Sequence, residues 1–300
     1  MRLEIIASLL IASGAYAQAP SSKLPAKATQ APANTTTPAK EIIPVYMSSK
    51  RALVMLRVGD NPPVPVVFDT GTNGNLVDVK LADRLGLPNT GSSPSIDGST
   101  GKPVPGHDSF IKNARLGGVA IPDARATALA YDETDEIGIF GPNSFPDRLV
   151  EMDGPGSRLI VHAKTAATIP PGPGTPYLGT GGSALPSATL DFGGLKVAAI
   201  LDSGNDGPII LPMAYKDKLA LQAPPVRIGF AVSAAGRQPI FAARLKGVVR
   251  IASATLVQPQ IYFMEGGRPN IGLPILRKLS VVYDHSGSRS WILTTEPVRP

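Results

Sequence analysis

The stretch VVFDTGT, residues 66–72, decides the fold, and it has a counterpart in AAILDSGN, residues 198–205. Each stretch leads from apolar residues into an Asp, a hydroxyl residue and a glycine. A single Asp-Thr-Gly or Asp-Ser-Gly is typical of an ordinary turn, in which the Asp accepts hydrogen bonds from nearby backbone N–H groups and the glycine takes an unusual φ. Two copies that each follow an apolar strand pattern indicate an internal repeat.

The residues on either side of the two turns repeat in the same order. Apolar runs before each turn flank a glycine-containing turn, which predicts a β-hairpin that ends at the Asp. These runs are 53–58 and 64–68 in the first copy, and 189–192 and 197–201 in the second. A short apolar strand and then a helix are expected after each turn, with the helices at 80–87 and 213–221.

Each copy continues with an apolar segment that ends in glycine, IFG at 139–141 and NIG at 270–272. The two glycines, Gly141 and Gly272, follow the Asp of their own turn by 72 and 70 residues. Because these spacings are nearly equal, we align the two halves as copies of one structural unit.

Both copies close with a predicted hairpin, at 149–161 and 279–293. The chain holds 31 glycines and 31 prolines but is only 5% aromatic, which is typical of short strands joined by many turns. We therefore predict an all-β protein with two lobes, residues 41–168 and 187–300. The Pro- and Gly-rich segment 169–186 is expected to be the linker between them.

The N-terminal residues resemble an export signal. Arg2 precedes an apolar run at 5–12, and the small-residue site Ala-Tyr-Ala follows at 15–17. The alternative is a first buried strand. The apolar run is too short to span a bilayer, so we expect cleavage of 1–17 and a periplasmic or secreted protein without a membrane span. Residues 18–40 are then a disordered tether or a propeptide.

Several kinds of chemistry are disfavoured by composition. There is no cysteine, and His107, His162 and His285 lie too far apart in sequence for a zinc motif, so we expect neither a metal nor another cofactor. The histidines are expected in turns or at strand ends, the acidic run 132–136 in a solvated loop, and Trp291 in the core. The formal charge of +6 comes from scattered Lys and Arg, so nucleic acid is not an expected partner.

A pseudo-twofold arrangement of the halves would bring Asp69 and Asp202 together. Two carboxylates at close range share one proton over a wide pH range. The ionised partner then takes a proton from a water molecule while the protonated partner donates to a carbonyl oxygen. Beside them, Thr70 and Ser203 offer hydroxyls that can cross-link the two turns.

These motifs resemble those of the pepsin and retropepsin-like aspartic proteases, in particular a small bacterial exported member with two tandem retropepsin-like lobes. The resemblance implies two β-barrel lobes with a central cleft, and it makes Asp69 and Asp202 the catalytic pair. It also implies that hydroxyls interlock beneath the pair and that buried glycines support it. The supporting residues are Thr70, Gly71, Thr72, Ser203, Gly204, Asn205, Gly141 and Gly272.

The sequence departs from the family pattern at three places. Thr72 matches the hydroxyl residue expected after the glycine, but Asn205 does not, and Asp206 beside it adds charge. The segment 92–106 occupies the place of the flap, the hairpin that closes over substrate, yet lacks the Tyr common in pepsin-like flaps. Asn270 stands where the family pattern has an apolar residue.

The expected activity is that of an aspartic endopeptidase acting on a peptide or unfolded protein bound in extended conformation. Because one chain encodes both Asp turns, a monomer suffices. The departures motivate an alternative of another class, an inactive peptide-binding protein of the same fold. A third hypothesis is a dimer in which each half pairs with its counterpart in another molecule.

Overall fold

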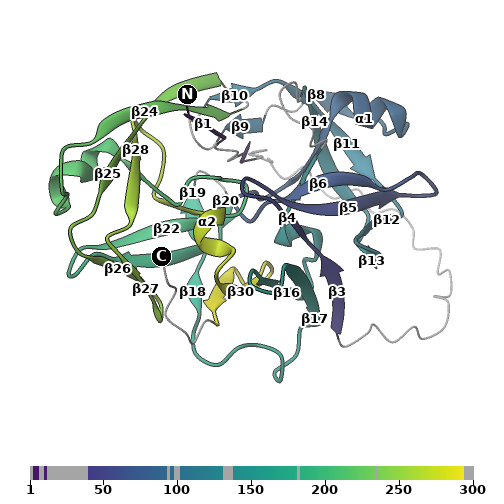
Figure 1. Cartoon of the computed structure of the whole chain (residues 1–300). Coiled ribbons are helices and arrows are strands. Elements are labelled where there is room, and N and C mark those ends of the chain that lie inside the picture. Colours follow the sequence, from purple (N-terminus) through teal and green to yellow (C-terminus); the bar gives the residue numbers. More distant parts are fainter. Residues whose placement is uncertain are drawn as a thin grey trace, which may run out of the picture.

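The computed structural model describes residues 3–6, 10–11, 40–92, 95–97, 102–130, 138–180, 183–233 and 236–293. Figure 1 shows two β-rich lobes, the first in purple and blue and the second in green and yellow. The helical elements within the described residues are short. The all-β, bilobal fold class predicted from sequence is confirmed.

The first lobe is built on the hairpin of β5 (Ala52–Val58) and β6 (Val64–Phe68). After the turn come β7 (Asn75–Asp78) and helix α1 (Val79–Arg84), which Asp78 caps by accepting from the N–H groups of Lys80 and Leu81. Strand β15 (Gly138–Phe140) lies between β6 and β7. The rest of this sheet is formed by β4 (Tyr46–Met47), β8 (Gly91–Ser92), β11 (Gly106–Ile111), β12 (Ala114–Leu116), β13 (Val119–Ala120) and β14 (Ala124–Leu129).

The second lobe repeats this design with β21 (Ser187–Asp191), β22 (Lys196–Asp202), β23 (Ile209–Pro212) and β29 (Asn270–Gly272). Strand β29 pairs parallel with β22 and antiparallel with β23, as β15 pairs with β6 and β7. The remaining strands of the sheet are β24 (Val226–Ser233), β25 (Gly236–Arg244), β26 (Val248–Ile251), β27 (Ala254–Val257), β28 (Gln260–Met264) and β1 (Leu3–Ile6). The internal repeat is therefore present in the topology as well as in the sequence.

The second expected helix differs from its prediction. It forms a 3₁₀-helix, η2 (Met213–Lys218), and Leu219 after it is extended. Pro212 at its start provides no side-chain cap, and none of its residues is buried. Without a capped end or a buried apolar face, this segment lacks the interactions that stabilise an α-helix. The corresponding short helices after the later glycines are η1 (Pro142–Ser144) and α2 (Leu273–Leu276).

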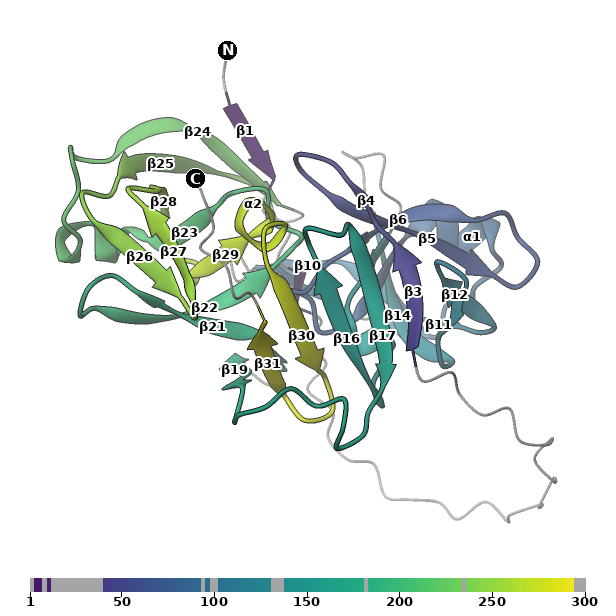
Figure 2. The same ribbon diagram turned by 60° about the horizontal axis from the view of Figure 1, so that its bottom comes forward.

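A third sheet joins the lobes, as Figure 2 shows. Its order is β18-β31-β30-β16-β17-β3, and β16 of the first lobe pairs with β30 of the second, with Val150 opposite Tyr283. The predicted closing hairpins are thus its centre. The strands are β3 (Lys40–Pro44), β16 (Arg148–Asp153), β17 (Arg158–Ala163), β18 (Thr175–Pro176), β30 (Ser280–Asp284) and β31 (Arg289–Ile292). A continuous apolar core runs from both lobes into this sheet.

The segment 169–186 contains more regular structure than a linker pattern suggests. Strand β18 adds to the edge of the joining sheet beside β31, and β19 (Leu178–Thr180) pairs with β20 (Ser183–Leu185). Proline is tolerated in a short edge strand because the missing N–H faces away from the ladder. The connection between the lobes is therefore anchored to the sheet that joins them.

The predicted flap region folds as a hairpin of β9 (Ser95–Asp97) and β10 (Pro103–Val104). From the N-terminal residues, β2 (Leu10–Ile11) pairs with β9, and β1 pairs in parallel with β24. The expected cleavage site at 15–17 and the tether 18–39 lie outside the described residues, while Lys40 begins β3. Among the described residues, no helix has the length and hydropathy needed to cross a membrane.

Candidate active site

The two Asp turns lie at equivalent places in the two lobes. Asp69 follows the last residue of β6, and Asp202 is the last residue of β22. Each turn lies against the glycine of the apolar segment that was aligned between the two halves: a Cβ at Gly141 would overlap the Asp69 carbonyl oxygen, and one at Gly272 would overlap that of Gly207. The two glycines therefore permit the close approach that positions each Asp.

Thr70 and Ser203 cross-link the turns in a symmetric way. The Thr70 N–H donates to Ser203 Oγ at 3.0 Å, and the Ser203 N–H donates to Thr70 Oγ1 at 3.0 Å. The hydroxyl of Thr70 donates to the Leu201 carbonyl and that of Ser203 to the Phe68 carbonyl, each at 2.7 Å. Each hydroxyl thus fixes the backbone of the opposite lobe.

The carboxyl groups of Asp69 and Asp202 lie together at the centre of this arrangement, and both residues are 0% exposed. The Gly204 N–H reaches both, at 3.2 Å from Asp69 Oδ1 and 3.0 Å from Asp202 Oδ1. Because one nitrogen bonds both oxygens, these two oxygens lie no more than about 6 Å apart, which is the sum of two hydrogen-bond lengths. Asp69 Oδ1 also accepts from the Gly71 N–H at 2.7 Å.

Burial makes both carboxyls weak acids. Burial, then the charge of Asp202, holds the pKa of Asp69 well above its usual value. Burial also raises the pKa of Asp202 to about 6, against hydrogen bonds from Asn270 and Asp69 that lower it. Both carboxyls are therefore weaker acids than an ordinary Asp side chain, and they titrate as a coupled pair.

The two lobes support their Asp residues with different side chains. In the first lobe, Thr72 Oγ1 donates to the Gly74 carbonyl at 3.0 Å. In the second lobe, Asn205 donates to Asn270 Oδ1 at 2.6 Å, and Asn270 donates to Asp202 Oδ2 at 2.6 Å. The two Asn residues that depart from the family pattern are therefore in contact with each other and with the site.

Two further residues near the turns were not singled out as site residues in the sequence. Arg51 is 4% exposed, and its Nη1 donates to the carbonyls of Lys50 at 3.0 Å and Gly204 at 3.4 Å, so it bridges the first lobe to the second Asp turn. Tyr283 of the joining sheet is fully buried, and its burial and the nearby dyad raise its pKa. No local pattern distinguishes either residue, because both reach the site through pairings distant in sequence.

The other sequence candidates lie apart from the two Asp turns in the fold. His107 is in β11, His162 Nε2 lies 3.0 Å from Glu151 Oε2, and His285 follows β30 with a pKa lowered by burial. Trp291 is largely buried, as predicted, and its Nε1 donates to the Gly172 carbonyl at 3.2 Å. The acidic run 132–136 lies outside the described residues.

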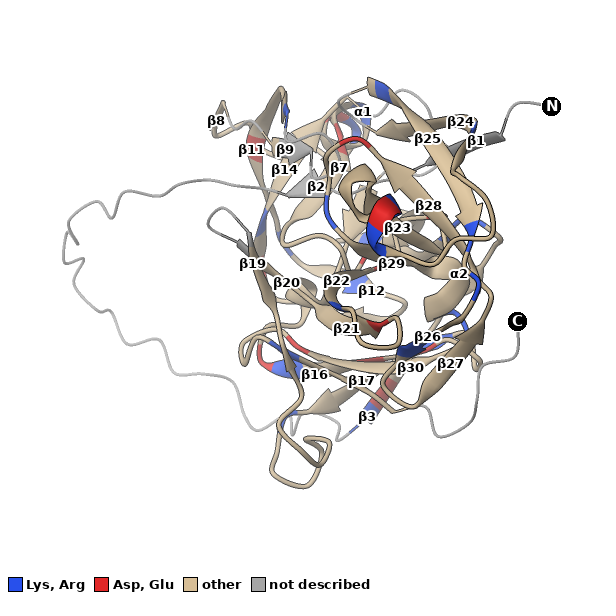
Figure 3. Ribbon diagram, turned by 90° about the vertical axis from the view of Figure 1, so that its left-hand side faces the viewer, with Lys and Arg blue, Asp and Glu red and all other residues tan. Residues whose placement is uncertain are grey.

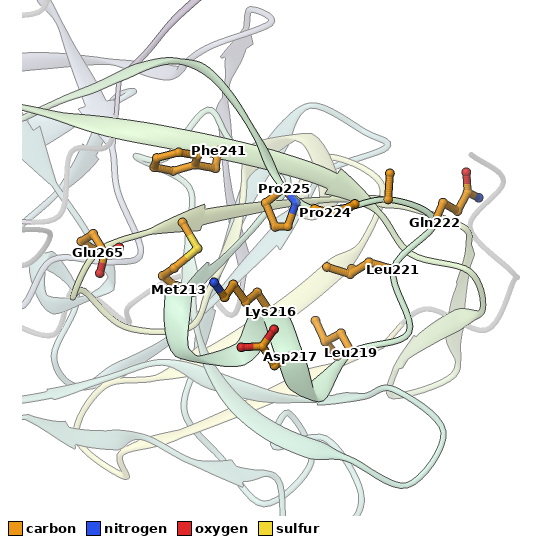
Figure 4. A pocket seen from close by; sticks show the side chains of 11 residues that line it. Met213, Lys216, Asp217, Leu219, Leu221, Gln222, Pro224, Pro225, Phe241 and Glu265 are labelled. Carbon is orange, nitrogen blue, oxygen red and sulfur yellow. The ribbon is translucent and has the colours of Figure 1, made fainter.

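The surface adds two observations. Lys and Arg are spread over both lobes rather than gathered on one face in the view of Figure 3. An open pocket of about 640 Å³ lies between η2 and β25, lined by apolar side chains such as Met213, Leu221 and Phe241 with Lys216, Asp217 and Glu265 among them (Figure 4). Sequence analysis gave no indication of this pocket.

Comparison with known proteins supports the interpretation of the first lobe. Residues 54–143 match the family model described as aspartyl protease. No curated protein matches the chain. Among solved structures, basic 7S globulin from soybean aligns with a TM-score of 0.48 and 13% identity, over 84% of this chain and 94% of that one.

The matched residues include the first Asp turn and Gly141. For residues 54–143, the family match agrees with the aspartic protease resemblance that the motifs predicted from sequence.

Proposed function

We propose that this protein is an aspartic endopeptidase whose catalytic pair is Asp69 and Asp202. The observation that carries the proposal is the pair of buried carboxyls bonded to the same Gly204 N–H, on turns that the two lobes supply by the same topology. Within the described residues no cluster of metal-binding side chains was found. Two buried carboxyls that share one N–H donor can act as acid and base, and we propose this chemistry for the pair.

In the proposed reaction, ionised Asp202 takes a proton from a water molecule while the oxygen of that water attacks the carbonyl carbon of the peptide. Protonated Asp69 donates its proton to the carbonyl oxygen, which gives a neutral tetrahedral gem-diol. The C–N bond then breaks, the Asp202 proton passes to the leaving nitrogen, and a gem-diol proton returns to Asp69. The products are a carboxylic acid and an amine, without a covalent enzyme intermediate.

The substrate class we propose is an extended peptide or an unfolded segment. Two hairpins near the N-terminal residues already take an added strand: β9 pairs with β2, and β24 pairs with β1. Exposed strand edges bind extended chains through main-chain hydrogen bonds. The proposed substrate would bind in the same way. Because both Asp turns meet within one chain, we propose a monomer, and export to the periplasm or beyond remains part of the proposal.

Cleavage of an unfolded protein such as reduced, denatured casein tests the proposal across pH 4 to 8. The variants Asp69→Asn and Asp202→Asn are expected to lose activity by about 10³-fold, because each removes one partner of the proton transfer. Asp191→Asn, which changes an exposed hairpin carboxylate bonded to the Gly193 and Gly194 N–H groups, is the matched control and should retain activity.

Activity that persists in both dyad variants would contradict the mechanism. Tight peptide binding without turnover by the unmodified protein would instead support the alternative, an inactive peptide-binding protein. Asn205 is the residue that motivates this alternative, because it stands where the family pattern has a hydroxyl.

A further inference from the structure

A chain of amide hydrogen bonds leads from the backbone to Asp202. The Gly207 N–H donates to Asn205 Oδ1 at 2.8 Å, and Asn205 Nδ2 donates to Asn270 Oδ1 at 2.6 Å. Asn270 Nδ2 then donates to Asp202 Oδ2 at 2.6 Å. Both Asn residues are buried, at 1% and 6% exposure. We call Asn205 and Asn270 together the amide relay.

The backbone fixes the direction of this relay. An N–H can only donate, so the Gly207 N–H requires the oxygen of the Asn205 amide on its side. The Asn205 NH₂ must then face the oxygen of Asn270, and the Asn270 NH₂ must face Asp202. Reversing the Asn270 amide would place two NH₂ groups against each other and an amide oxygen against a carboxyl oxygen. The relay can therefore only present a donor to Asp202 Oδ2.

The first lobe has no matching relay. Thr72 and Ile139 occupy the positions that correspond to Asn205 and Asn270, and the apolar side chain of Ile139 cannot donate. Among the described residues, no backbone N–H, amide or hydroxyl group donates to the buried Asp69 Oδ2. A buried oxygen without a donor is stabilised by carrying a proton, whereas an oxygen held by a donor is stabilised as the anion. The supports of the two carboxyls are thus unequal.

We propose that the amide relay is a positioning device that keeps Asp202 as the ionised member of the pair and leaves the shared proton on Asp69. Asn205 and Asn270 act as one unit: Asn205 orients the amide of Asn270, and Asn270 bonds the carboxylate. Asn205 and Asn270, which both depart from the family pattern, then act together in place of the hydroxyl residue that the pattern has after the glycine. The assignment of base and acid to the two carboxyls rests on the proposed function, but the position of the proton does not.

The test is a carbon NMR titration of the Asp carboxyls in the full chain without substrate, with the dyad signals assigned through Asp69→Asn and Asp202→Asn. In the unmodified protein the Asp202 carboxyl should ionise first. In Asn270→Leu its midpoint should rise by about one pH unit or more, because a hydrogen bond to a charged group is lost. If the protein cleaves peptides, the acid limb of its pH profile should move by the same amount.

Asn75→Leu is the matched control. Asn75 is also a buried strand Asn, at 5% exposure, but its side chain is hydrogen-bonded to Asn143, Ser144 and the Arg125 carbonyl. This variant should lose stability and leave the Asp202 midpoint unchanged. If the Asn270→Leu effect came only from a general loss of stability, the Asp202 midpoint would shift by the same amount in both variants.

Ionisation of Asp69 before Asp202 would overturn the proposal, and so would an unchanged midpoint in a folded Asn270→Leu variant. If that variant does not fold, Asn205→Ala keeps Asn270 in place and removes what orients it, and it should shift the midpoint in the same direction. An unchanged midpoint there would also overturn the proposal. Because no substrate is present, absence of peptide cleavage would count against the proposed function alone.

Discussion

The two catalytic candidates are the same residue type on equivalent turns, yet their surroundings differ. Asp202 accepts from an amide NH₂ and a backbone N–H, one on each oxygen. Asp69 has its backbone donors on Oδ1, while its Oδ2 is buried without a partner in the described part of the chain. The asymmetry lies in two side chains rather than in the backbone, so point substitutions can test it.

The pH dependence of activity follows from this asymmetry. The proposed mechanism needs Asp202 ionised, and burial raises its pKa to about 6. We expect kcat/KM to fall tenfold for each pH unit below about 6 and to level off above it, because the raised pKa of Asp69 keeps that carboxyl protonated to higher pH than Asp202. Initial rates on a fluorogenic peptide from pH 4 to 8 would measure this. A maximum near pH 3 would contradict it.

The same shift predicts how stability varies with pH. Because the folded pKa of Asp202 lies above the value near 4 of an unfolded chain, the folded state binds more protons in between. The stabilisation is complete below pH 4 and is lost as pH rises through about 6. Relative to Asp202→Asn, the unmodified protein should lose on the order of 2 kcal/mol between pH 4 and 7. Urea unfolding of both proteins at several pH values provides the measurement. If their free energies of unfolding change equally with pH, the prediction is wrong.

At the scale of elements, the decisive contact is the passage of β15 and β29 against the Asp turns. Gly141, directly after β15, and Gly272, the last residue of β29, have no room for a methyl group. Main-chain hydrogen bonds also hold each Asp turn to the end of the strand beside it. The Asp69 N–H donates to the Phe140 carbonyl at 2.8 Å, and the Leu273 N–H donates to the Asn205 carbonyl at 2.8 Å. The turns cannot move away from an added side chain without losing these bonds.

Gly272→Ala should therefore destabilise the fold by about 3 kcal/mol, because the new methyl group meets the Gly207 carbonyl and displaces the second Asp turn. Gly247→Ala is the control, since a Cβ there has nothing within 4 Å and φ is not positive. Thermal unfolding of the two variants provides the measurement. Equal melting temperatures would mean that the turn adapts.

Local sequence patterns predict the individual strands and hairpins, but they do not predict which segments far apart in sequence come into contact. The hairpins ending at Asp69 and Asp202 could be predicted because alternation and turn residues act over a few positions. The amide relay could not, since Asn205 and Asn270 are 65 residues apart and meet only through the crossing of β29. For the same reason the pairing of β16 with β30, and of β18 with β31, was beyond a local pattern.

At the scale of the whole molecule, both side chains and a sheet join the lobes. The hydroxyls of Thr70 and Ser203 bond across the axis of the repeat, and the joining sheet pairs strands of both halves beneath it. The apolar core is continuous between them. Two lobes connected in this way are expected to unfold as one unit.

The single tryptophan provides the measurement, because Trp291 is in β31 of the joining sheet. Its fluorescence and the far-UV circular dichroism should change together on heating, with one midpoint. Two separate midpoints would show that one lobe unfolds before the joining sheet does.

The interlock should behave as a coupled pair. Thr70→Val and Ser203→Ala each remove a hydroxyl that makes bonds to the opposite lobe, so each alone should cost about 2 kcal/mol. The double variant should cost clearly less than the sum of the two, because loss of either hydroxyl frees the turn that carries the other hydroxyl and weakens the bonds that it makes. Strict additivity in a double-mutant cycle would argue against a shared network.

The Gly204 N–H described above makes the site observable through one atom. Its proton faces an oxygen of each carboxyl, so its chemical shift will follow the charge on both acids at once. In a nitrogen-labelled sample, this single cross-peak would trace the loading and unloading of the site by pH or by an inhibitor, with no reporter group attached.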